Sequence, residues 1–142
     1  MNELNAGTLS LTDDELVRAI ESCALESAFH HADHVRIAWI YLRAMPAPQA
    51  VERMCTTLKR FAAGQGKLER YHHTMTLAWM RLVSAALRTS SPSASFAEFI
   101  STNLDLEDQG TLARYFSAKL LSDPISREAW VEPDLAALPA LP

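Results

Sequence analysis

The sequence predicts an all-α protein built as a single bundle of about five to seven helices. Three observations lead to this prediction. Apolar residues recur at helical spacing in several segments, no segment alternates with period two long enough to indicate a strand, and the chain contains only four glycines. A length of 142 residues, with 49% hydrophobic and 21% charged residues, suits one globular domain.

Cap and breaker residues divide the first half of the chain into helices. Residues 1–11 are expected to form a loose arm, after which Thr12 and Glu15 form a capping box that starts the first helix. Proline and glycine residues bound the next two helices. The helices expected in this half cover residues 12–26, 31–45 and about 48–63.

The second half is expected to hold shorter helices and a tail. Ser95 and Glu98 form a second capping box, and Pro124 ends a later helix. The helices expected here cover residues 68–87, 95–102 and 111–121, with one further turn over 126–131. Residues 132–142 contain three prolines and should form an extended C-terminal tail.

Composition also limits the expected partners and location. The net charge of −4 and the lack of a basic stripe give no reason to expect nucleic acid. The longest apolar stretch, residues 37–42, is far shorter than the ~20 residues that span a bilayer, and no signal peptide is recognisable. We therefore expect a cytoplasmic protein without membrane association, with homodimerisation left open. Cys23 and Cys55 fall on apolar stripes and are expected to be buried, reduced thiols.

All five histidines lie near the starts of two predicted helices. They occur as His30, His31 and His34 in one place and as His72 and His73 in the other. The apolar stripes of the two helices, extended backwards by three or four residues, reach His31, His34 and His72, which should therefore face the interior. His73 lies on the flank of its helix, and the direction of His30 is left open.

Short loops predict antiparallel neighbouring helices, which would place both histidine clusters at one end of the bundle. Imidazoles that converge there suit a divalent transition metal such as zinc, copper, nickel or iron. We therefore expect His31, His34, His72 and His73 as metal ligands, and His72, Tyr71 and His73 as catalytic residues. Whether His30 or Glu69 joins the site is left open.

Two helix N-termini at one place attract anions through their dipoles. Arg36, Lys67 and Arg70 lie within a turn or two and are expected to bind a small anionic substrate. No motif for a nucleotide cofactor is present.

Two sequence motifs are similar to motifs of a known protein family. Residues 29–39 read F-x-H-x-x-H-V-R-x-A-W, and residues 71–79 read Y-H-H-T-x-T-x-A-W. Over about residues 12–140 the chain resembles a family of small all-helical bacterial proteins that have no established activity. The resemblance implies that His31, His34, Tyr71 and His72 act together. Such sequences carry glutamate where this chain has His73, so a carboxylate role there is either lost or replaced by an imidazole.

These patterns predict a small protein with a histidine-rich pocket, a metal-binding enzyme that acts on a small anionic substrate. Two alternatives stay open: a metal-free enzyme that uses histidine and tyrosine for acid–base chemistry, and a non-catalytic interaction or accessory subunit. The sequence specifies neither a reaction nor a particular metal, so enzymatic activity itself is left open.

Overall fold

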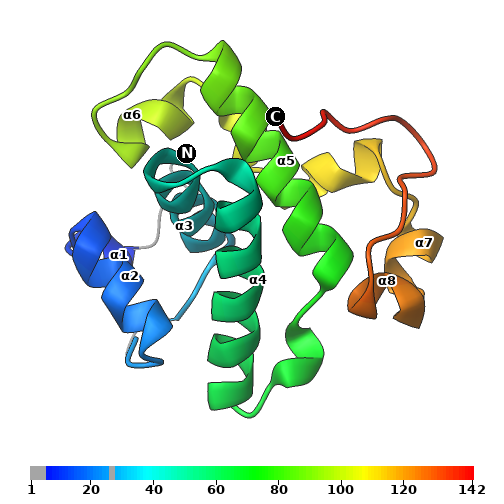
Figure 1. The fold of residues 1–142 in the computed structure, drawn as a ribbon, viewed down its shortest axis with the longest axis horizontal. Coiled ribbons are helices and arrows are strands. Elements are labelled where there is room, and N and C mark those ends of the chain that lie inside the picture. The colour runs from blue at the N-terminus through cyan, green and yellow to red at the C-terminus, as the bar shows by residue number, and fades with distance from the viewer. Residues whose placement is uncertain (1–5, 26–27) are drawn as a thin grey trace. The chain divides into compact units, whose positions relative to one another are not determined.

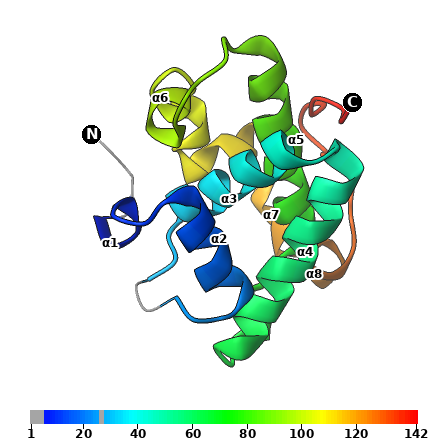
Figure 2. The ribbon, with the colours of Figure 1, turned by 60° about the vertical axis from the view of Figure 1, so that its left-hand side comes forward.

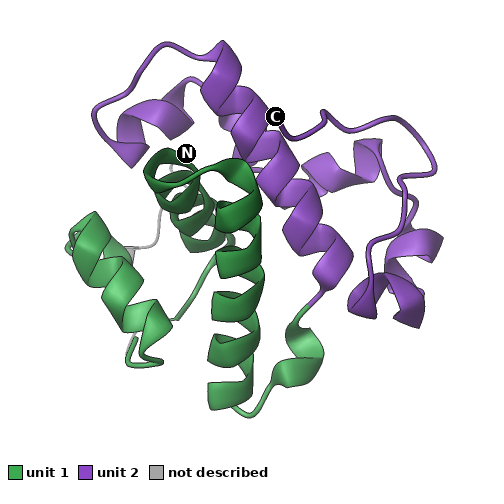
Figure 3. Ribbon diagram, in the orientation of Figure 1, with its two compact units in different colours: residues 1–71 green, residues 72–142 purple. Residues whose placement is uncertain are grey.

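A computed structural model describes residues 6–25 and 28–142 of the chain. The protein is all-helical, with 66% helix and no strand in the described ranges, which confirms the predicted fold class. The chain separates into two compact units, Met1–Tyr71 and His72–Pro142 (Figure 3). The expectation of a single domain stays a prediction.

In its described residues, 6–25 and 28–71, the first unit has four α-helices and one 3-10 helix. They are α1 (Ala6–Leu9), α2 (Asp13–Glu21), α3 (His31–Ala44), α4 (Ala47–Gly64) and η1 (Leu68–Arg70). The chain reverses direction between α3 and α4, which make the most extensive helix contact of the unit (Figure 2). The α2 helix packs against both, and η1 lies against α4.

The core of this unit lies between α2, α3 and α4. The expected apolar stripes are buried. On α3 the buried surface is wider than the predicted stripe, because Ile37 and Trp39 are as inaccessible as Val35. Burial of each large apolar side chain contributes about 1.5–3 kcal/mol. The buried apolar residues of the unit are Leu16, Ile20, Ala32, Val35, Ile37, Ala38, Trp39, Tyr41, Ala50, Met54, Leu58 and Phe61.

The first long helix ends earlier than its sequence pattern suggests. The capping box of Thr12 and Glu15 is present, but α2 stops at Glu21, and Cys23 has a left-handed backbone with φ of 59°. Because the chain leaves the helix there, Cys23 leaves the apolar stripe and is exposed, while Cys55 is half-buried. The predicted burial of both thiols is therefore wrong. The expected helix end, Glu26, falls outside the described residues.

Part of the expected N-terminal arm is folded. Residues 1–5 fall outside the described residues, whereas Ala6–Leu9 form α1. Thr8 is 2% exposed, and its hydroxyl donates a hydrogen bond of 2.6 Å to the Asp33 carboxylate of α3. A buried, hydrogen-bonded residue fixes this segment to α3, so residues 6–9 do not form a loose arm.

The second unit is organised around its longest helix. Its elements are α5 (His73–Thr89), α6 (Phe96–Ser101), η2 (Leu104–Leu106), η3 (Gln109–Arg114), α7 (Ala118–Ser122) and α8 (Pro124–Glu128). The α8 helix packs against α5 and α7, and η2 packs against α6 and η3. Figure 1 shows α7 and α8 side by side near the end of the chain.

Two helices predicted for residues 68–87 and 111–121 are each broken in the structure. The first is interrupted at Tyr71, which is extended, and α5 begins only at His73, with the imidazole of His72 as its cap. The second is interrupted between Arg114 and Ala118, because the Ser117 hydroxyl accepts a hydrogen bond from the amide of Leu120 and starts a new helix. In both cases a side-chain cap competes with helix continuation.

The C-terminal tail is extended, as predicted, and is bound to the second unit. The backbone amide of Leu135 donates to the carbonyl of Tyr115, and Asp134 accepts hydrogen bonds from both the amide and the hydroxyl of Ser117. Further along, the guanidinium of Arg88 donates to the carbonyl of Ala140. Within the described ranges, no helix combines the length and hydropathy needed to cross a membrane.

Candidate functional site

The first histidine cluster lies at the start of α3. His30 is the exposed N-cap residue, and His31 and His34 are half-buried on the first turn. Asp33, 2% exposed, fixes this turn: one carboxylate oxygen accepts from the Thr8 hydroxyl, and the other accepts from the His30 amide at 2.8 Å. Asp33 was not among the expected site residues, although an acidic residue at the third helical position indicates such a cap.

The imidazole of His34 is held in its neutral form. Its ring lies 4.3 Å from the ring of Phe29, which in turn makes an edge contact with Phe61 of α4. Burial, with a smaller contribution from the nearby His31, lowers the pKa of His34 to about 4. A neutral imidazole is the form that binds a metal or accepts a proton near pH 7.

Arg36, an expected substrate ligand, is already engaged by the protein. Its guanidinium forms a salt bridge of 2.9 Å with Asp13 and donates to the carbonyls of Thr8 and Leu11. The Arg36 side chain is 11% exposed. The interactions of Arg36 therefore connect α3 to α1, to the first residue of α2 and to the segment between these two helices.

The second cluster begins at His72, where both ring nitrogens are occupied. Nδ1 accepts a hydrogen bond from the amide of Met75 at 3.1 Å, and Nε2 donates to the carbonyl of Leu121 at 2.8 Å. These two bonds fix a neutral imidazole with its proton on Nε2. Burial lowers the pKa of His72, in agreement with the neutral form. The ring therefore joins the start of α5 to the end of α7.

Thr74 makes a second link of this kind that the sequence analysis missed. Its side chain is fully buried; the hydroxyl donates to the carbonyl of Ala129 at 2.8 Å and accepts from the amide of Val131 at 3.2 Å. His73 is the first residue of α5 and is half-buried. Side chains at the start of α5 are therefore hydrogen-bonded to the chain both before and after α8.

The remaining expected site residues lie on or beside η1 in the first unit. Tyr71 is half-buried, and the ammonium group of Lys59 lies 5.3 Å from its ring centre. Lys67, Glu69 and Arg70 are exposed. Tyr71 closes the first unit, and His72 opens the second.

The expected metal ligands also divide between the units, with His31 and His34 in the first and His72 and His73 in the second. Among the described residues, no three or more His, Cys, Asp or Glu side chains are arranged to hold a metal ion. The coordination of one metal by all four histidines stays a prediction.

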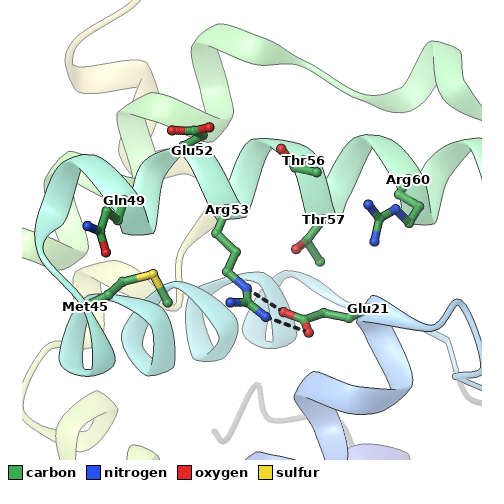
Figure 4. A pocket seen from close by; sticks show the side chains of 8 residues that line it. All are labelled: Glu21, Met45, Gln49, Glu52, Arg53, Thr56, Thr57 and Arg60. Atoms are coloured by element: carbon green, nitrogen blue, oxygen red, sulfur yellow. Dashed lines mark hydrogen bonds and ion pairs between the residues drawn. The ribbon is translucent and has the colours of Figure 1, made fainter.

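The first unit has a pocket of about 460 Å³ that the sequence analysis did not foresee. The Glu21 carboxylate, which lines this pocket, accepts a hydrogen bond from the hydroxyl of Tyr41. Both of its oxygens also accept hydrogen bonds from the guanidinium of Arg53 (Figure 4). The Tyr41 hydroxyl also lies 3.0 Å from that of Thr57. The pocket is lined by Glu21, Met45, Gln49, Glu52, Arg53, Thr56, Thr57 and Arg60.

The charges of this pocket alter two pKa values. Burial and the hydrogen bond to Glu21 raise the pKa of Tyr41 to about 12. The hydrogen bonds from Arg53 lower the pKa of Glu21. Because Tyr41 and Arg53 are 20 and 32 residues from Glu21, no local spacing in the sequence could have indicated this group.

Comparison with protein-family models, with curated proteins and with solved structures finds no match for the chain. The family resemblance that rests on the two histidine motifs stays a prediction.

Proposed function

We propose that this protein is a metal-dependent enzyme that binds a divalent transition metal through His31 and His34 and acts on a small anionic substrate. The observation that supports the proposal is the pair of half-buried imidazoles on the first turn of α3, one of them neutral with a pKa of about 4. The bound metal would polarise an oxygen atom of the substrate.

The two histidines suit this role for physical reasons. Residues three apart on a helix are neighbours, with Cβ atoms about 5–6 Å apart, so two imidazoles at this spacing can approach one ion. A proton competes poorly with a metal for His34 because its pKa is low. Two protein ligands leave two of four tetrahedral positions for water and substrate, whereas catalytic zinc sites with three protein ligands leave one.

The surroundings of the pair add support. The ring of Phe29 packs on His34, and the carboxylate of Asp33 fixes the turn that carries both histidines. The proposal does not use His72, whose ring nitrogens are both hydrogen-bonded, or Arg36, whose guanidinium is paired with Asp13.

Titration of the untagged protein with Zn²⁺ and Ni²⁺, followed by calorimetry, tests the proposal. We expect saturable binding of one ion per chain, lost in His31→Ala and in His34→Ala. The matched control is His30→Ala, which removes an exposed imidazole from the same turn and should bind like the wild type. Circular dichroism checks that each variant stays folded.

Two results would contradict the proposal. The first is the absence of saturable binding of any of Zn²⁺, Ni²⁺, Cu²⁺ and Fe²⁺ to the wild type. The second is an equal loss of binding in all three histidine variants, because then the two half-buried rings would have no special role.

A further inference from the structure

The pocket of the first unit contains an organised ion pair and, next to it, a second cation. Arg53 and Arg60 are seven residues apart on α4, so they project from the same face of the helix two turns apart. Both lie near the carboxylate of Glu21 from α2, whose pKa they both lower. Figure 4 shows Arg53 reaching from α4 to Glu21, with Arg60 further along the same helix.

Both carboxylate oxygens of Glu21 accept hydrogen bonds from other side chains of the protein. Its Oε2 atom accepts from the Tyr41 hydroxyl and from Nε of Arg53, and its Oε1 atom accepts from Nη2 of Arg53. The bidentate arrangement with Arg53 leaves the third nitrogen of that guanidinium, Nη1, without a hydrogen bond among the described residues.

Within the described residues, the guanidinium of Arg60, unlike that of Arg53, is not held by hydrogen bonds. Its guanidinium makes no hydrogen bond or ion pair with any residue of the described ranges, although it lines the pocket. The lining contains two guanidinium groups and two carboxylates, so its formal charges balance. Glu52 is next to Arg53 but eight residues from Arg60, about 12 Å along the helix, so the excess of positive charge lies at the Arg60 end of the pocket.

We propose that this pocket binds the anionic group of a small molecule, a carboxylate or a phosphate, between Arg60 and the Nη1 side of Arg53. A guanidinium presents several N–H donors in a plane and suits both kinds of anion. The hydroxyl of Thr56, which lies between Arg53 and Arg60 on α4 and also lines the pocket, offers a further polar contact. A volume of about 460 Å³ is within the range of sites that hold small organic ligands.

This site goes beyond the proposed metal function, because it shares no residue with the His31–His34 pair. Its ligand is retained by charge and hydrogen bonds alone. The rigid anchoring of Glu21 by Tyr41 and Arg53 favours binding, because these side chains are already ordered before a ligand arrives.

Nuclear magnetic resonance titration of the ¹⁵N-labelled full chain tests the inference with three probes: succinate, inorganic phosphate and the neutral diamide succinamide. We expect at least one anion to give saturable shifts at residues 53–60 of α4, and succinamide to give none there. Saturation by succinate alone would identify a carboxylate site, and saturation by phosphate alone would identify a phosphate site.

Two variants of α4 provide the matched comparison. Arg60→Gln should weaken anion binding by about tenfold or more, the loss expected for one charge-assisted hydrogen bond. Lys59→Gln removes the same charge from the neighbouring position, which stacks on Tyr71 outside the pocket, and should change binding by less than about twofold. Arg60→Gln should leave zinc binding unchanged, so this site and the metal site can fail independently.

Three outcomes would overturn the inference. They are no saturable shift with either anion, binding of succinamide as strong as that of succinate, and equal weakening by the Arg60 and Lys59 substitutions. The last outcome would indicate a diffuse response to net charge rather than a site.

Discussion

The replacement of His72 by alanine tests whether this residue mainly supports the fold. The side chain caps α5 through Nδ1 and reaches the carbonyl of Leu121 through Nε2. Loss of an N-cap costs about 1 kcal/mol. Loss of the second bond costs a further ~1 kcal/mol. The Ser126 hydroxyl lies 3.2 Å from the Leu121 carbonyl but donates its one proton more closely to the carbonyl of Asp123, at 2.7 Å. We therefore expect His72→Ala to lower the free energy of unfolding by about 2 kcal/mol.

Urea denaturation followed by circular dichroism measures this loss, and two further variants separate its parts. His72→Asn keeps a capping side chain but cannot reach Leu121, so it should cost about 1 kcal/mol. Ser95→Ala removes only a cap, the one that Ser95 provides for the amide of Glu98, and should also cost about 1 kcal/mol. A His72→Ala protein that unfolds at the wild-type midpoint would refute the reasoning and would favour a catalytic or metal-binding role for the ring.

Two further predictions concern pH and packing. The pKa values of His34 and His72 are lower in the folded protein than the ~6.5 of an unfolded histidine, so protonation favours unfolding. Their stabilising contribution is complete above pH 6.5 and falls at lower pH, and that of His34 is lost as the pH falls towards 4. We therefore expect a lower urea midpoint at pH 5.5 than at pH 7.5, and a smaller difference in His34→Gln. An unchanged difference in that variant would assign the effect to other groups. Leu82→Ala should cost about 2–5 kcal/mol by leaving a cavity in α5 while zinc stoichiometry stays the same, and a loss below 1 kcal/mol in the same urea assay would contradict the burial of Leu82.

Much of the fold follows from local features of the sequence. The capping box at Thr12, the prolines at the start of α4 and the apolar periodicity of α3 and α4 predict helices that the structure contains. These signals are reliable because each depends on residues only a few positions apart. The extended tail follows equally from its prolines.

Helix ends and the surroundings of single side chains required the tertiary structure. Periodicity extends an apolar stripe to His72, but it contains no information about the carbonyl of Leu121, which is 49 residues away and determines what that ring does. The same holds for Arg36, which meets Asp13 and Leu11, and for Thr8, which is buried against Asp33. Each of these contacts forms only after helices have packed.

The sequence by itself therefore determined the helical class, the order of the main helices and the positions of five histidines along them. The tertiary structure decided which polar groups are occupied and which remain available. It engages both ring nitrogens of His72 and the guanidinium of Arg36, and it gathers Glu21, Tyr41, Arg53 and Arg60 into one pocket. The physical reason is that helix formation depends on near neighbours, whereas hydrogen bonding and charge pairing of side chains depend on residues that only packing brings together.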